Sequence, residues 1–320
     1  MQTTSSEPKQ TIDTASAPAS PSRFRWRRIL LLGLLVVVAI VGVRTARQLK
    51  EAKERVKQAE LENSTGSDVK VTKPERDPEK PSHPLDPALE IAYRALERIQ
   101  TSVTDYTATI VSRELVLGKL GPTRSIQVRI RNRRMRGEER VTPFSVYLKF
   151  VQPRKLNGRE VIWVECHHDG KMISHEPGFK NFFRIKLKPT SLLAMIGSRY
   201  PITEIGIEKM VAKLIQKGER DRQHGDCEVE IDKDAEVDGV RCTRIRVKHP
   251  VKEDHFDFHI AEIYLDEERL VPLRYSAYDW PAKKGESPPL MEEYIYRDLK
   301  LNVGLQEKDF DPDNEEYDFP

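Results

Sequence analysis

The longest run of hydrophobic residues lies near the N-terminus, at Ile29 to Val43, where fifteen residues carry no charged or polar side chain. A helix of this length reaches about 22 Å, which is short for a hydrocarbon core of about 30 Å. A secretory signal peptide would need a small-residue cleavage site, and none follows. The pattern therefore predicts an uncleaved transmembrane signal anchor at 23–46, with Arg28 and Arg44 reaching the interfaces.

Polar segments of different composition flank this anchor. Residues 1–22 are rich in Ser, Thr, Pro and Ala and are expected to be a disordered tail. Residues 47–62 are strong helix formers and predict a helical stalk, and the prolines of 63–85 indicate an extended linker. Basic residues both precede and follow the apolar segment, so the positive-inside rule leaves its orientation open.

Two segments have apolar residues at helical spacing. We expect Asp86 to cap the first helix, with Pro87 in its first turn. Its apolar face holds Leu89, Ala92, Leu96, Ile99 and Val103. The second helix lies beyond Pro201, and its apolar face holds Ile207, Met210, Val211, Leu214 and Ile215.

The rest of the chain alternates between apolar and polar residues, which is typical of antiparallel strands with one wet face. The predicted strands are 107–117, 125–133, 144–151, 160–166, 171–175, 182–187, 227–231, 240–247, 256–265, 271–278 and 292–301. A sheet of about ten strands cannot stay flat. The expected fold class is α+β: a curled antiparallel sheet with two packing helices, forming a soluble domain at 86–320 behind the membrane helix.

Composition changes this picture little. Hydrophobic residues make up 38% and charged residues 33% of the chain, and the net charge of +3 is too small to indicate a nucleic-acid partner. Three cysteines exclude a disulfide framework. A single Cys227–Cys242 bridge and two unpaired core thiols are both compatible with the sequence, and the unpaired thiols are favoured.

Two clusters have the residue types that chemistry requires. His255, Asp257 and His259 share one face of a predicted strand and are suited to a metal such as zinc, but a polar strand face in water is the favoured explanation. The run Cys166 to Asp169 offers a nucleophile and a base, but neighbours in a strand point to opposite faces. We therefore predict no catalytic residues, no metal and no cofactor, and a protein that is not an enzyme.

Arginines gather between Arg124 and Arg140, and three of them form a ladder on the outward face of a predicted strand. Arg129, Arg131 and Arg133 fit phosphate groups, and no aromatic residue is interleaved for base stacking. A solvated face is the favoured interpretation, and if the ladder binds a partner, lipid headgroups are the expected one.

Three motifs carry a resemblance to a known family. They are 197–203 followed by Ile205-Gly206, then 278–281, and finally 294–302 with Phe310-Asp311. Together they resemble the bacterial domain-of-unknown-function family 1571, over roughly residues 88–319. The closing pattern is also similar to the LolA-like lipoprotein carriers, which implies a half-open barrel with an apolar cavity for acyl chains.

This resemblance implies an extracytoplasmic domain, and hence a single-pass inner-membrane protein with a cytoplasmic N-terminus and a periplasmic domain. The implied function is to hold a lipid or lipoprotein acyl chain. The alternative is a non-catalytic structural or interaction protein of the cell envelope with a filled barrel and an unidentified partner. The expected lipid contacts, which would also suit an ordinary core, are Phe182, Phe183, Leu187, Leu192, Leu193, Met195 and Ile196.

Overall fold

The structure, a computed structural model, describes residues 57, 71–74, 82–178, 182–225 and 227–320. The predicted tail and anchor, the stalk apart from Lys57, and most of the linker lie outside the described residues. Within the described ranges, no helix has both the length and the apolar character needed to cross a membrane. The predicted transmembrane helix therefore stays a prediction.

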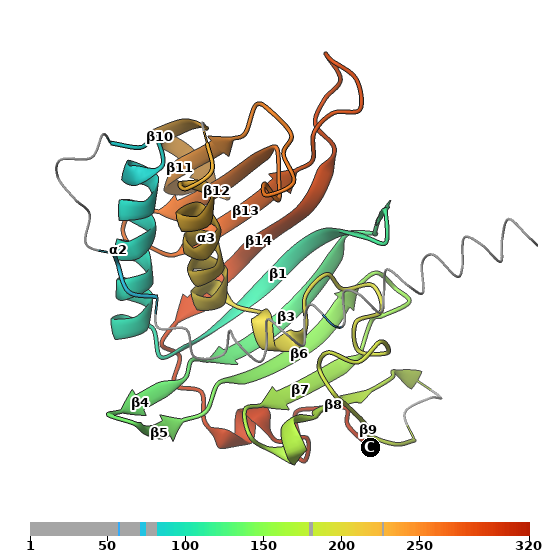
Figure 1. Cartoon of the computed structure of the whole chain (residues 1–320). Coiled ribbons are helices and arrows are strands. Elements are labelled where there is room, and N and C mark those ends of the chain that lie inside the picture. Colours follow the sequence, from blue (N-terminus) through green and yellow to red (C-terminus); the bar gives the residue numbers. More distant parts are fainter. Residues whose placement is uncertain (1–56, 58–70, 75–81, 179–181, 226) are drawn as a thin grey trace, which may run out of the picture. The chain divides into compact units, whose positions relative to one another are not determined.

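Two α-helices lie on the same face of a large sheet (Figure 1). Helix α2 spans Asp86–Ser102 and helix α3 spans Ile207–Asp221. The capping role expected of Asp86 is wrong, because Asp86 lies inside the first turn and Leu85 precedes it as the cap residue. The Asp86 carboxylate instead accepts a hydrogen bond from the His83 N–H and pairs with Arg222 at 2.7 Å.

The sheet has 12 strands among the described residues, and every pairing is antiparallel. The strands are β1 Asp105–Val116, β2 Lys119–Leu120, β3 Arg124–Arg131, β6 Ser145–Gln152, β7 Glu160–Val164, β8 Met172–His175, β9 Ile185–Leu187, β10 Glu228–Val237, β11 Val240–Lys248, β12 Ile260–Asp266, β13 Pro272–Tyr278 and β14 Leu290–Leu301. A separate hairpin pairs β4 Arg134–Arg136 with β5 Glu139–Thr142. Short 3₁₀ turns lie at His168–Gly170, Ile202–Glu204 and Glu307–Phe310.

The strand order runs β10-β11-β12-β13-β14-β1-β3-β6-β7-β8-β9, with β2 beside β1. The two end strands, β10 and β9, do not pair with each other, so the sheet is open. The first and last strands of the chain, β1 and β14, pair in its middle and join its two halves. The predicted α+β class is thus confirmed as a large open antiparallel sheet with two packing helices, consistent with a half-barrel.

Two predicted strands start later than the pattern indicated, and the first of them, β9, begins at Ile185 instead of Phe182. Strand β12 begins at Ile260, whereas the alternation placed its start at Phe256. Phe256 and Phe258 are both buried, and the Phe256 ring stacks on His249 with centroids 3.9 Å apart. These aromatic residues pack a loop, so their spacing of two does not reflect a strand.

The start of α3 is held against β1 by a close backbone approach. Gly206 precedes the helix with φ +113, and a Cβ at this position would lie 2.8 Å from the Tyr106 hydroxyl oxygen. That oxygen accepts a hydrogen bond from the Ile207 N–H at 3.0 Å. Glycine fits both the positive φ and the contact distance.

Residues near the C-terminus cover the opposite face of β6 and β7. Along these strands successive side chains alternate between two cores: Val146 joins the main core, while Tyr147 packs with Phe310 and Tyr317. The rings of Tyr147 and Tyr317 stack with centroids 4.1 Å apart. This half of the sheet therefore buries both faces, and the wet outer face expected from the sequence is wrong here.

Candidate binding cavity

A cavity of about 530 Å³ lies between the inner face of the sheet and the chain that joins β9 to α3. Its floor is hydrocarbon, because alternate residues of successive strands point inward. The floor residues are Ile110 of β1, Ile126 of β3, Leu148 and Phe150 of β6, Val161 of β7 and Met172 of β8.

The covering segment, residues 188–206, forms the opposite wall with mostly apolar side chains. Those that line the cavity include Pro189, Leu193, Ala194, Ile196, Tyr200 and Ile202. From α3, Met210 and Leu214 complete the wall, on the stripe predicted to be apolar.

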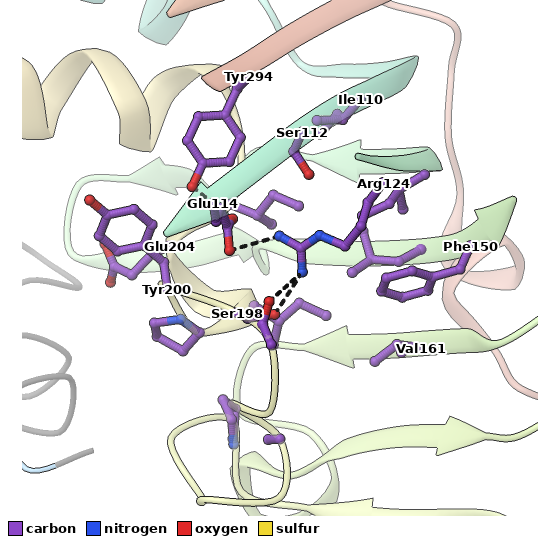
Figure 2. A pocket seen from close by; sticks show the side chains of 18 of the residues that line it. Ile110, Ser112, Glu114, Arg124, Phe150, Val161, Ser198, Tyr200, Glu204 and Tyr294 are labelled. Carbon is purple, nitrogen blue, oxygen red and sulfur yellow. Dashed lines mark hydrogen bonds and ion pairs between the residues drawn. The ribbon is translucent and has the colours of Figure 1, made fainter. Parts of the chain in front are cut away.

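A buried ion pair ties the covering segment to the sheet at one end of the cavity. Arg124 pairs with Glu114 at 2.7 Å and donates hydrogen bonds to the Gly197 carbonyl at 3.0 Å and the Ser198 hydroxyl at 3.1 Å. The other oxygen of Glu114 accepts a hydrogen bond from the Tyr294 hydroxyl at 2.8 Å. Figure 2 shows Arg124 reaching between Glu114 and Ser198, with the Tyr294 hydroxyl pointing at the carboxylate.

A second carboxylate, Glu292 of β14, organises the neighbouring polar groups. Its oxygens lie 3.2 Å from Arg199 Nε and accept hydrogen bonds from the hydroxyls of Tyr200 at 3.2 Å and Tyr275 at 3.4 Å. Burial, reinforced by the charge of Glu292, raises the pKa of both tyrosines above the usual range. These hydroxyls are therefore neutral donors at physiological pH, and the polar wall satisfies most of its own hydrogen bonds.

Basic side chains also line the cavity. Lys209 and Lys213 lie one turn apart on α3, and Lys155 and Arg159 come from the connection between β6 and β7. Arg159 pairs with Glu176 at 2.7 Å, also on the cavity wall.

The predicted lipid contacts fall into two groups. Leu187, Leu193 and Ile196 line the cavity, whereas Phe182, Phe183, Leu192 and Met195 do not. Phe182 and Phe183 are 76% and 64% exposed. For all seven predicted residues, contact with lipid stays a prediction.

The sequence reasoning missed the floor residues on β1, β3, β6, β7 and β8, although the alternation of these strands marks them as inward-facing.

The three predicted headgroup arginines lie against carboxylates of the chain itself. Arg129 pairs with Asp309 and Glu316, both at 3.1 Å, and Arg131 pairs with Glu307 at 2.8 Å. Arg133 pairs with Glu165. Their contact with lipid headgroups stays a prediction, and none of the three lines the cavity.

The histidine–aspartate cluster does not assemble. Residues 255–259 precede β12, so His255, Asp257 and His259 do not share a strand face. Asp257 pairs with Lys217 at 3.1 Å and Arg220 at 3.2 Å, while His259 Nδ1 lies 2.8 Å from the His249 carbonyl. Among the described residues, no three His, Cys, Asp or Glu side chains form a group able to hold a metal ion.

No disulfide joins the three cysteines, all of which lie in the described residues: Cys227 and Cys242 are buried and Cys166 is exposed. Burial raises the pKa of the Cys242 thiol to about 11, so it stays protonated at neutral pH. Cys166 lies in a turn with positive φ, and its sulfur accepts a hydrogen bond from Arg140.

The fold is an open antiparallel sheet with an apolar cavity between its inner face and the covering segment. The chain belongs to the family described as proteins of unknown function, DUF1571, whose profile matches residues 103–319. The family membership indicated by the three sequence motifs is thus confirmed. A comparison with curated proteins found no match.

Several solved structures are similar at low identity. A DUF1329 family protein from Desulfovibrio piger is 16% identical, with 72% of this chain and 98% of that chain covered and a TM-score of 0.36. A putative outer membrane lipoprotein-sorting protein domain from Vibrio parahaemolyticus is 17% identical, with 70% and 95% covered and a TM-score of 0.33. A LolA superfamily protein from Nitrosomonas europaea is 12% identical, with 69% and 97% covered and a TM-score of 0.27.

Proposed function

We propose that this protein is a non-catalytic binding domain that holds the acyl chain of a lipid or lipoprotein. The observation that carries the proposal is the cavity of about 530 Å³ with a hydrocarbon floor. Cavities that bind small molecules have volumes of roughly 300–1,000 Å³ and are mostly apolar.

The pairing of polar groups around the cavity favours an apolar ligand. Glu114 already accepts hydrogen bonds from Tyr294 and Arg199 and pairs with Arg124. A polar ligand would have to compete with these interactions inside a buried site, at the cost of leaving a charged group unpaired. An acyl chain contacts the floor without disturbing them.

A filled barrel that acts as a structural or interaction protein of the envelope is the alternative. Protein interiors are close-packed, with few voids larger than a water molecule. A void of about 530 Å³ between sheet and covering segment therefore favours the binding domain over the filled barrel.

The proposal includes a membrane tether. With the predicted anchor at Ile29 to Val43, the domain would stand at the outer surface of the inner membrane, in the periplasm. A tethered domain cannot diffuse between two membranes. We therefore propose local acceptance or holding of a lipid at one membrane.

Lipid binding is tested with a cavity-filling substitution. The full chain is purified in detergent, exchanged into nanodiscs and mixed with a fluorescent fatty acid. Ala194 lines the cavity, so Ala194→Phe should reduce uptake at least tenfold. The matched control is Ala282→Phe, an exposed site outside the cavity, which should bind like the unmodified chain.

Mass spectrometry of lipid extracted from the same preparations gives a second readout. The unmodified chain should carry a bound acyl lipid, and the number of lipid molecules per chain should be lower in Ala194→Phe. If neither protein takes up the fatty acid, or if both Phe variants bind equally well, the cavity is not an acyl-chain site.

A further inference from the structure

Two stretches at the mouth of the cavity have an unusual composition. Residues 151–159 contain Arg154, Lys155 and Arg159, and residues 182–203 contain four further basic residues. Neither stretch contains an aspartate or a glutamate. Acidic residues are otherwise frequent, 51 in the chain, so these two rim segments stand out because every charged residue in them is basic.

The rim segments also hold most of the exposed apolar surface. Of the eleven large hydrophobic side chains that the described part of the chain exposes, six lie in these 31 residues. They are Val151, Phe182, Phe183, Leu192, Leu193 and Ile196. The most exposed are Phe182 at 76% and Ile196 at 71%. Apolar side chains gathered in this way mark an interaction surface.

Several charges of the rim face solvent. Within the described ranges, no ion pair is formed by Arg154, Lys155, Lys186 or Lys188, and all four are exposed. By contrast, Arg184 of the rim pairs with Asp313, and Arg159 pairs with Glu176. The rim therefore presents unpaired positive charge beside protruding apolar groups.

We propose that the rim segments dock onto the surface of an anionic lipid bilayer. Basic residues that flank apolar side chains are the pattern of interfacial membrane binding, in which the lysines meet anionic headgroups and the apolar groups enter the acyl boundary. The absence of acidic residues in both segments gives charge complementarity to such a surface.

The geometry favours a bilayer over an acidic protein. Five of the six apolar side chains lie in turns on either side of the short edge strand β9, whereas a protein partner is usually bound by a packed, shape-complementary patch. The cavity opens between the two rim segments, since Lys155, Leu187, Leu193 and Ile196 all line it. A docked rim would let an acyl chain enter the cavity without crossing water. The docking surface goes beyond the proposed function, because Phe182, Phe183 and Leu192 lie outside the cavity.

The test measures how close the rim lies to lipid in the full chain. The protein is reconstituted in nanodiscs with 30% phosphatidylglycerol or with phosphatidylcholine alone. Each sample carries one fluorophore, at Phe183→Cys or at Val251→Cys, in a Cys166→Ser background. Phe183 and Val251 are both 64% exposed, and Val251 lies outside the two rim segments, so it is a matched control. Quenching by brominated lipid tails reports insertion.

We expect at least threefold more quenching at position 183 than at 251 in anionic nanodiscs, and a loss of this excess in phosphatidylcholine. The charge reversal Lys186→Glu with Lys188→Glu should remove more than half of the excess. The same reversal at the exposed pair Lys283 and Lys284 should leave it unchanged. Equal quenching at positions 183 and 251 overturns the proposal, and it is also the result expected if the rim binds an acidic protein. The proposal is likewise overturned if the excess quenching at position 183 is the same in anionic and in phosphatidylcholine nanodiscs. Fatty-acid uptake is measured on the same samples, so failure to dock is distinguished from failure to bind.

Discussion

Glu160 gives a sharp test of how the sheet and the C-terminal residues are held together. Its side chain is fully buried and lies 2.8 Å from Lys149 Nζ and 3.1 Å from His175 Nε2. It also accepts hydrogen bonds from the Tyr147 hydroxyl at 2.8 Å and the Asp318 N–H at 2.9 Å. Burial by itself raises the pKa of this carboxyl, but the four donors outweigh it and lower the pKa to about 2.

The size of the effect follows from this pKa. A carboxyl whose pKa falls from 4.5 in the unfolded chain to about 2 in the folded protein stabilises the fold above pH 4.5. At about 1.36 kcal/mol per pH unit, the contribution at pH 7 is roughly 3 kcal/mol. It is lost as the pH falls from 4.5 through 2, because the folded carboxylate then takes up its proton.

Glu160→Gln keeps the shape of the side chain and removes the charge. We expect the free energy of unfolding to fall by roughly 3 kcal/mol at pH 7 and to differ little from that of the unmodified chain at pH 2. Urea unfolding of the full chain in detergent, followed by tryptophan fluorescence, measures both values. Glu139→Gln, at an exposed site in β5, should change stability by less than about 0.5 kcal/mol. A loss of equal size at pH 7 and pH 2 would refute the reasoning, because it would show that the shape of the amide, and not the missing charge, destabilises the fold.

Three further substitutions or labels test other parts of the fold. Arg124→Met leaves a buried carboxylate without its cation, so we expect a loss of about 3–5 kcal/mol in urea unfolding and faster proteolysis of the covering segment; unchanged proteolysis would count against its role there. Gly206→Ala should lower the melting temperature more than Gly285→Ala, since both have positive φ but only the first places a Cβ against a neighbour. Native alkylation followed by mass spectrometry should modify Cys166 and spare Cys242, whose thiol is buried; equal labelling would contradict this burial.

The sequence predicted best those strands in which the apolar positions of the alternating pattern are the buried positions of the structure. Ile126, Val128 and Ile130 alternate with polar residues, and all three are buried in β3. The pattern failed at Phe256 and Phe258, which have the same spacing but pack a loop around His249. A spacing of two shows that side chains are buried on alternate positions and does not by itself distinguish a strand from a loop folded onto the core.

The candidate site was predicted less completely than the fold. Leu187, Leu193 and Ile196 were among the expected lipid contacts, and they line the cavity. The ion pair of Glu114 with Arg124 was not predicted, because neither residue has a local signature. Its companion Tyr294 lies 180 positions from Glu114, so only the pairing of β1 with β14 brings them together.

The sequence by itself determined the order of the two helices and the main strands, the inward face of strands such as β3, and the family to which the chain belongs. These properties depend on periodicity and motifs within short stretches of chain. The tertiary structure decided which charges meet and where a cavity remains. Arg129 lies on a predicted outward face, yet it is held by Asp309 and Glu316 because the C-terminal residues fold back over that face. Such contacts join segments far apart in the chain, and their energy depends on the whole sheet being formed.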